Sequence, residues 1–251
     1  MTPATVDDHG RGGPVRVVRA GERFVTRTTG VLSRHSFSFG PHYDPGNVGF
    51  GLLVVANDDV VAAPGEGYPE HPHRDVEVVT WVLSGALSHL DTGGHGGLVV
   101  PGVVQRMSAG RGVRHAEVAA EGPLRFVQMW VPPSDAGVDP SYGQADVTAD
   151  LAGGGLVAVV SGLRRHAGDA PVALGQRRAA MHVGRLGAGE RVTLPSAPFV
   201  HVYVARGEVD VESAGRLGEG DAVRLTDEGG RSVTALGAAE LVVWEMHAAV
   251  A

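Results

Sequence analysis

Two short segments carry side chains that could bind a metal ion. In "HPHRDVE", one residue separates His71 from His73, and Glu77 follows four residues later. In "GRGVRHAE", His115 and Glu117 repeat the spacing of two. Residues i and i+2 of a β-strand point to the same face, so each pair would project together. Imidazole and carboxylate groups are donors that divalent transition metals accept, and the two segments therefore predict a metal site.

The elements that must hold these side chains are β-strands. The apolar runs of the chain are short, rich in β-branched residues and interrupted by Gly, Pro, Asp or Asn, as in "VEVVTWVLSG" and "FVHVYVARG". This pattern is typical of an all-β barrel or sandwich. Gly110 and Gly112 precede His115 and permit a tight turn with positive φ at the start of its strand.

An internal repeat indicates how the strands are organised. Three segments of the first half align with three of the second: 81–90 with 202–211, 101–108 with 219–226, and 125–131 with 240–246. The alignment pairs Gly85 with Gly207 and Gly102 with Gly220. We therefore expect two similar barrels, an N-terminal metal-binding domain over residues 1–135 and a C-terminal domain over residues 136–251.

The second copy of the repeat serves as a control for the metal site. His71, His73 and His115 align with or near residues that cannot replace an imidazole: Thr193, Pro195 and Val233. An edge strand with incidental histidines would explain either segment alone, but two such segments in one copy argue against it. The C-terminal domain is expected to lack metal ligands and to serve packing, lid or partner functions.

Composition narrows the chemistry further. The 251 residues include no cysteine, which excludes thiolate zinc sites, disulfides and cysteine nucleophiles. The net charge of −7 argues against a nucleic-acid partner. Neither a secretory leader nor an apolar run of the roughly 20 residues that span a bilayer is visible, so we expect a cytoplasmic protein without a membrane partner, and a monomer. Three imidazoles and one carboxylate suit Fe(II), Mn(II), Ni(II), Cu(II) or Zn(II).

Three segments of the chain, 34–59, 71–94 and 107–117, resemble the pirin family, and most of all its bacterial quercetinase-type members. The paired motifs "HPHRDVEVVTWVLSG" and "SAGRGVRHAE" carry the resemblance, which covers nearly all of residues 16–132. It implies a bicupin, that is, two tandem cupin barrels of the double-stranded β-helix or jelly-roll type. It also implies that His71, His73, His115 and Glu117 are the metal ligands, with iron the usual metal.

The carboxylate ligand has two candidates. In the general cupin pattern the glutamate that follows the two histidines is a ligand, which would be Glu77. In pirins the ligand is the glutamate two residues after the last histidine, which is Glu117. We expect Glu117 to be the ligand, with Glu77 as a hydrogen-bond partner or an alternative ligand, and either carboxylate could act as a general base.

The resemblance implies a quercetin 2,3-dioxygenase type of activity on flavonol-like substrates. The 3-hydroxyl would bind the metal as an anion, and dioxygen would then open the heterocycle to a depside with loss of carbon monoxide. The alternative is a non-enzymatic, iron-binding regulator that binds a transcription factor or a metabolic enzyme. A third candidate is another cupin reaction on a specialised metabolite. Oxygen consumption with substrate separates an enzyme from a regulator.

Several neighbouring residues carry weaker expectations. Gln128 is expected to face the cavity, and Arg111 and Arg114 border the site, where they could attract an anionic substrate. His89 and His95 flank a glycine-rich turn and are expected to be solvated.

Overall fold

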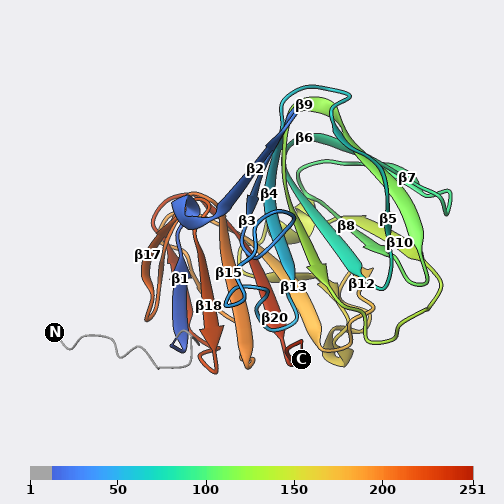
Figure 1. Ribbon diagram of the computed structural model, residues 1–251. Helices are drawn as coiled ribbons and strands as arrows, with labels where there is room; N and C mark the ends of the chain where they lie inside the picture. The colour runs from blue at the N-terminus through green and yellow to red at the C-terminus, as the bar shows by residue number, and fades with distance from the viewer. Residues whose placement is uncertain (1–12, 251) are drawn as a thin grey trace.

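The computed structural model describes residues 13–250, and strands dominate it (Figure 1). The elements up to residue 131 are β1 (Val15–Val18), η1 (Ala20–Glu22), β2 (Phe24–Thr28), β3 (Val31–His35), β4 (Val55–Val61), β5 (Gly67–His73), β6 (Glu77–Asp91), β7 (Gly96–Val99), β8 (Val103–Ser108) and β9 (Val113–Val131).

The later elements are β10 (Ser141–Asp146), α1 (Thr148–Leu151), β11 (Val157–Ser161), η2 (Arg164–His166), β12 (Val172–Ala173), β13 (Ala179–Leu186), β14 (Arg191–Thr193), β15 (Phe199–Arg206), β16 (Glu208–Val211), β17 (Gly215–Gly218), β18 (Ala222–Thr226), β19 (Ser232–Ala235) and β20 (Ala239–Met246). No helix in residues 13–250 is long and apolar enough to cross a membrane.

Three sheets build the two barrels. A nine-stranded sheet runs β10-β8-β6-β9-β4-β3-β2, with β5 paired to β9 and β7 paired to β6, and it forms the first barrel. A seven-stranded sheet in the order β1-β18-β15-β20-β13-β11-β12 and a four-stranded sheet in the order β14-β19-β16-β17 form the second. Figure 1 shows the orange and red strands of the second barrel beside the green and teal strands of the first. The expected all-β bicupin fold is confirmed.

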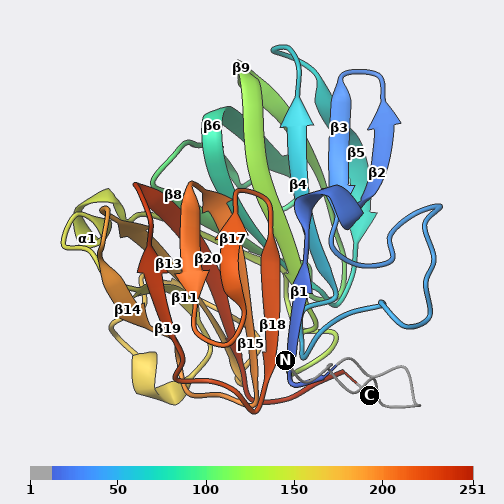
Figure 2. The ribbon, with the colours of Figure 1, turned by 90° about the vertical axis from the view of Figure 1, so that its left-hand side faces the viewer.

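The two halves exchange one strand each. β1 pairs with β18 in the sheet of the second barrel, as Figure 2 also shows, and β10 pairs with β8 in the sheet of the first. A boundary between residues 135 and 136 therefore does not separate the sheets. The exchange follows the repeat, because β8 and β18 are equivalent strands and each accepts a partner from the other half at the same edge.

The two halves share the same backbone conformation at a pair of equivalent glycines. Gly85 and Gly207 adopt φ angles of 75° and 74°. A Cβ at Gly85 would lie 2.8 Å from the Cα of Leu124, and one at Gly207 would lie 3.0 Å from the Cα of Ala239. Leu124 and Ala239 are themselves equivalent in the repeat. Both glycines are thus required by left-handed backbone and by close approach of a neighbouring strand.

The two barrels differ in what fills them. The second is packed with an apolar cluster in which Val233, near the position equivalent to His115, is completely buried. The first holds two smaller apolar clusters and, besides them, buried histidine, glutamate and glutamine side chains. The largest apolar cluster lies between the barrels and includes Trp81 and Met129 from one half and Trp244 from the other.

Candidate metal centre

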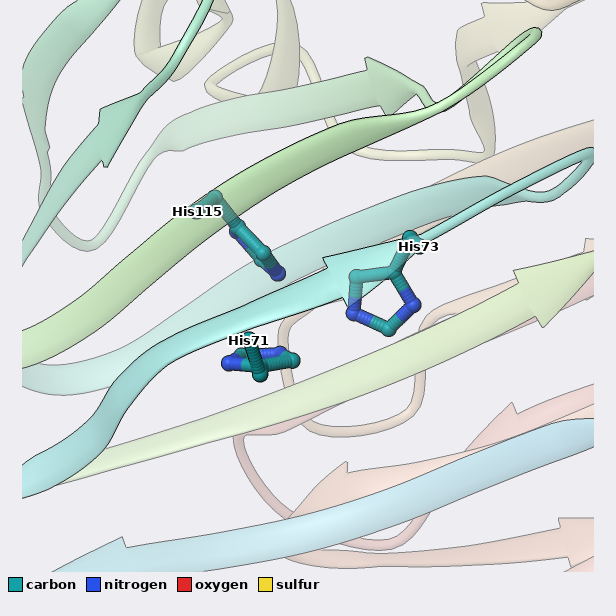
Figure 3. A group of neighbouring side chains, drawn as sticks. All are labelled: His71, His73 and His115. Atoms are coloured by element: carbon teal, nitrogen blue, oxygen red, sulfur yellow. The ribbon is translucent and has the colours of Figure 1, made fainter.

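Strands β5 and β9 bring three histidines together. They pair antiparallel, with His71 directly opposite His115 and His73 opposite Val113. One ring nitrogen from each of His71, His73 and His115 lies within 4.8 Å of the others. Figure 3 shows the three rings converging from the two strands. Spacing within each segment and register between the strands together assemble the group.

The ring nitrogens of this group are free to bind a cation. His71 Nδ1 lies 2.8 Å from the carbonyl oxygen of Pro69, which can only accept a hydrogen bond, so Nδ1 carries the proton and Nε2 keeps its lone pair. The Nε2 atoms of His73 and His115 are buried and have no hydrogen-bond partner among residues 13–250. Buried polar atoms are normally paired, so two buried nitrogens without partners, close to the free lone pair of His71, fit a missing cation.

Burial also sets the charge of these rings. It lowers the pKa of His73 to about 4, with the nearby His71 adding to the effect. It lowers the pKa of His115 to about 3, again with repulsion from His71 and His73. Neutral imidazole is the form that binds metals, so the donor set fits a divalent transition-metal ion.

Glu117 lies next to His115 but is not part of this three-histidine group. It is 1% exposed, and one of its oxygens lies within 4.8 Å of ring nitrogens of His89 and His115. Its Oε2 accepts a hydrogen bond of 2.6 Å from Gln128 Nε2, which confirms that Gln128 faces the interior. Its Oε1 has no hydrogen-bond partner in the described part of the chain. Burial raises the pKa of Glu117 to about 7.

Glu77 contacts the second half of the chain instead. Its Oε1 accepts a hydrogen bond of 2.5 Å from Ser108 Oγ, and its Oε2 accepts one of 2.9 Å from the backbone N–H of Gly175. Arg106 Nε lies 3.9 Å from the same carboxylate. Both oxygens of Glu77 are thus occupied, and the bond from Gly175 links the two halves of the chain.

The path of the chain explains why Glu77 does not join the histidines. Asp75, with a φ of 50°, ends the alternation of β5, and β6 begins as a new strand at Glu77. Glu77 pairs with Val131, whose side chain packs in the core between the barrels. Trp130, the residue before Val131 in β9, faces the other way, and its ring lies 4.9 Å from that of His73. The ligand and general-base roles considered for Glu77 do not fit this placement.

A cavity of about 420 Å³ opens beside His73. Arg111 and Arg114 line it, as expected, but each is matched by a carboxylate. Arg111 pairs with Asp139 at 2.5 Å, and Arg114 pairs with Glu70 at 2.7 Å. All four side chains are largely exposed, and such pairs contribute little to stability, so an anionic ligand could displace the carboxylates.

The expectation that His89 is solvated is wrong. His89 is 1% exposed, and its Nδ1 lies 3.4 Å from His115 Nδ1. Along β6, Leu87, His89 and Asp91 are buried while Leu90 is 63% exposed. The shared parity of His89 with Leu87 was the available sequence signal. The glycine-rich turn that follows β6 suggested a solvated loop instead, so the parity of His89 was not used.

Relatives of known sequence resemble the chain over nearly its whole length. The family model described as Pirin matches residues 17–131. A protein of Mycobacterium tuberculosis (strain ATCC 25618 / H37Rv), provisionally named as a quercetin 2,3-dioxygenase, is 48% identical over 93% of this chain and 96% of its own. A pirin-like protein of Caulobacter vibrioides is 39% identical over 85% of this chain and 91% of its own.

A solved structure agrees with these relatives. The bacterial pirin YhhW of Escherichia coli, in complex with nickel(II), superposes with a TM-score of 0.83 at 30% identity, covering 94% of this chain and all of its own. The sequence comparisons and the fold comparison indicate the same family, and this chain belongs to the pirin family.

Proposed function

We propose that the protein is a metal-dependent dioxygenase of the quercetin 2,3-dioxygenase type that acts on flavonol-like substrates. One observation carries the proposal: ring nitrogens of three histidines converge, and one of these histidines, His115, lies next to the buried carboxylate of Glu117, whose Oε1 has no hydrogen-bond partner among the described residues. The names of similar proteins support the choice of reaction.

His71, His73 and His115 would hold one divalent metal ion, with Glu117 as the carboxylate donor beside them. Iron is the usual metal of the family, and the E. coli relative contains nickel(II). Bound there, the ion would supply Lewis acidity that lowers the pKa of a substrate hydroxyl and an open coordination position for the substrate.

Two residues of the chain would accept the substrate proton and orient the group that accepts it. Glu117 would accept the proton of the 3-hydroxyl at Oε1, the oxygen that has no hydrogen-bond partner among the described residues. Gln128 holds Oε2 and fixes the orientation of the carboxylate. The flavonol anion and one dioxygen molecule give the depside and carbon monoxide, so both oxygen atoms enter the product.

A surface cavity next to His73 could receive part of such a substrate. The cavity beside His73 has a volume of about 420 Å³, which lies within the range of small-molecule sites. The Trp130 ring packs edge-on against His73 and provides an apolar surface next to the histidines. A planar aromatic substrate could pack against this surface with its hydroxyl directed at the three nitrogens.

Oxygen consumption with quercetin tests the proposal. The protein would be reconstituted without oxygen with Fe(II), Mn(II), Ni(II) or Cu(II), alongside His73→Ala and, as a matched control, His166→Ala in the second half. We expect metal-dependent oxygen uptake and carbon monoxide release that His73→Ala abolishes and His166→Ala retains. Metal binding without oxygen uptake would contradict the enzyme and favour the regulatory alternative.

A further inference from the structure

Three buried side chains, those of His115, His89 and Asp91, form a row that leads away from the metal centre; we call this row the file. His115 Nδ1 lies 3.4 Å from His89 Nδ1, and His89 Nε2 lies 3.6 Å from Asp91 Oδ2. The register of β6 and β9 places Asp91 directly opposite His115, with His89 two residues earlier on the same face. His89 and His115 are each 1% exposed, and Asp91 is 8% exposed. The file therefore lies inside the first barrel, away from bulk water.

The neighbours of His89 determine which of its nitrogens carries the proton. The amide nitrogen of Gln105 lies 3.2 Å from His89 Nδ1 and can only donate, so Nδ1 is an acceptor. The carboxylate of Asp91 lies 3.6 Å from Nε2, which has no hydrogen-bond partner among residues 13–250, and the negative charge of Asp91 favours a proton there. These two contacts lead independently to the same tautomer, with the proton of His89 on Nε2.

This tautomer determines that of His115. Because His89 Nδ1 is an acceptor, only a proton on His115 Nδ1 makes the contact between the rings favourable. The lone pair of His115 is then on Nε2, the nitrogen that has no hydrogen-bond partner within residues 13–250. A metal-binding histidine is commonly oriented in this way by the group that its other nitrogen contacts.

The far end of the file is held in place from two sides. Asp91 Oδ1 accepts hydrogen bonds from the backbone N–H groups of Gly93 at 2.8 Å and His95 at 3.0 Å. Burial alone would raise the pKa of Asp91, but these bonds and the His95 ring outweigh it and hold the pKa below its usual range. Asp91 is therefore a carboxylate at neutral pH.

The other support comes from the exchanged strand. Tyr142 of β10 stacks between two imidazoles, with its ring centroid 4.9 Å from that of His89 and 5.6 Å from that of His95. Its hydroxyl donates a hydrogen bond of 2.7 Å to Gln144 on the same strand. The C-terminal half thus contributes a side chain that packs on the ring next to a metal-binding candidate.

We propose that His89 is a positioning residue that fixes the tautomer of His115 and directs its Nε2 lone pair at the metal, with Asp91 and Tyr142 holding His89 in turn. The inference rests on the proposed metal site. It adds that the first barrel depends on the strand donated by the second half for the orientation of a ligand, not only for its fold.

A pair of polar substitutions separates this role from simple packing. In His89→Asn the side-chain oxygen occupies the position of Nδ1 and keeps the acceptor for His115. In His89→Gln the amide reaches the position of Nε2 and leaves the Nδ1 position without an acceptor. The tautomer of His115 would be read from long-range ¹H–¹⁵N NMR spectra of the metal-free protein, and Ni(II) affinity from calorimetry.

We expect the Nδ1–H tautomer in wild type and in His89→Asn, with Ni(II) affinities within about threefold of each other. We expect a mixed or reversed tautomer in His89→Gln and a Ni(II) affinity about 10- to 100-fold weaker, as is typical when a group that orients a metal ligand is lost. Tyr142→Ala should weaken Ni(II) binding in the same direction, and it provides a second variant should His89→Gln not fold.

Two results would overturn the inference: an unchanged His115 tautomer in His89→Gln, or equal losses of affinity in the Asn and Gln variants. Absence of Ni(II) binding by the wild-type protein would instead contradict the proposed metal site. The tautomer measurement is made without metal, so it remains decisive for the His89 inference in that case.

Discussion

Glu77 and Glu117 are both almost completely buried, and their surroundings separate a structural carboxylate from a chemical one. Glu77 has both oxygens occupied by donors, one of them the backbone of Gly175 in the second half. Glu117 has one oxygen held by Gln128 and the other free, next to His115. A buried acceptor without a donor is costly, so the free oxygen indicates a group that awaits a cation or a proton.

The two glutamates should therefore respond oppositely to the same substitution. Glu117→Gln removes the negative charge beside the histidines, and we expect Ni(II) affinity measured by calorimetry to fall at least tenfold with little loss of stability. Glu77→Gln weakens the contacts with Ser108 and Gly175, and we expect about 1–3 kcal/mol lower free energy of unfolding with Ni(II) affinity unchanged. The assignment fails if Glu77→Gln is the variant that loses the metal.

A third buried carboxylate predicts how stability depends on pH. Burial raises the pKa of Asp59 to about 7 from an unfolded value near 4, and hydrogen bonds from Ser33 and Tyr68 offset this only in part. The folded protein therefore binds a proton that the unfolded chain releases, and this contribution is lost as the pH rises toward 7. Asn does not titrate, so Asp59→Asn removes this pH-dependent loss of stability. Between pH 5 and pH 8 the stability of Asp59→Asn relative to wild type should rise by about 3 kcal/mol.

Urea unfolding of the metal-free wild type and of Asp59→Asn at the two pH values measures this difference. A constant difference between the two proteins would show that Asp59 does not titrate in this range.

At the scale of elements, the sequence predicted that the two histidine segments form one group, but not the strand register that assembles it. Two-residue spacing placed His71 with His73, and the repeat predicted equivalent turns at Gly85 and Gly207. Parity failed for Glu77 because Asp75 turns the chain between β5 and β6. Strand pairing decides which distant residues meet, as for His71 opposite His115, and no local pattern encodes it.

The paired glycines give a test at this scale. An alanine at Gly85 would require a φ of 75° and would bring its Cβ within 2.8 Å of three backbone atoms of residues 121–124. We expect Gly85→Ala and Gly207→Ala each to lower the free energy of unfolding by about 2 kcal/mol or more in urea titrations. Gly187→Ala is the matched control, because a Cβ there meets nothing within 4 Å and its φ is not left-handed. Equal effects at the three positions would contradict the argument.

At the scale of the whole molecule, the two barrels form one structural unit. Besides exchanging β1 and β10, they share an apolar cluster that includes Trp81 and Trp244. Buried polar contacts cross the same interface. Trp81 Nε1 donates to Glu240 at 2.7 Å, and the Tyr203 hydroxyl donates to Asp58 at 2.6 Å. Each half alone would expose this apolar surface and leave Glu240 and Asp58 without those donors.

We therefore expect the chain to fold as a unit and a cut at the sequence-derived boundary to fail. A fragment of residues 1–135 lacks β10, so the outer edge of β8 has no partner, Tyr142 is absent beside His89, and the Trp81 face of the sheet is open to water. Urea unfolding of the full chain should be a single transition, coincident by tryptophan fluorescence and circular dichroism, whereas the fragment should show no cooperative transition and no Ni(II) binding. A control fragment of residues 1–147 restores β10 and Tyr142 but still exposes the shared apolar surface, so it should remain unstable. Cooperative unfolding of the 1–135 fragment with wild-type Ni(II) affinity would show instead that the first barrel is an autonomous domain and that the second is not needed for its metal site.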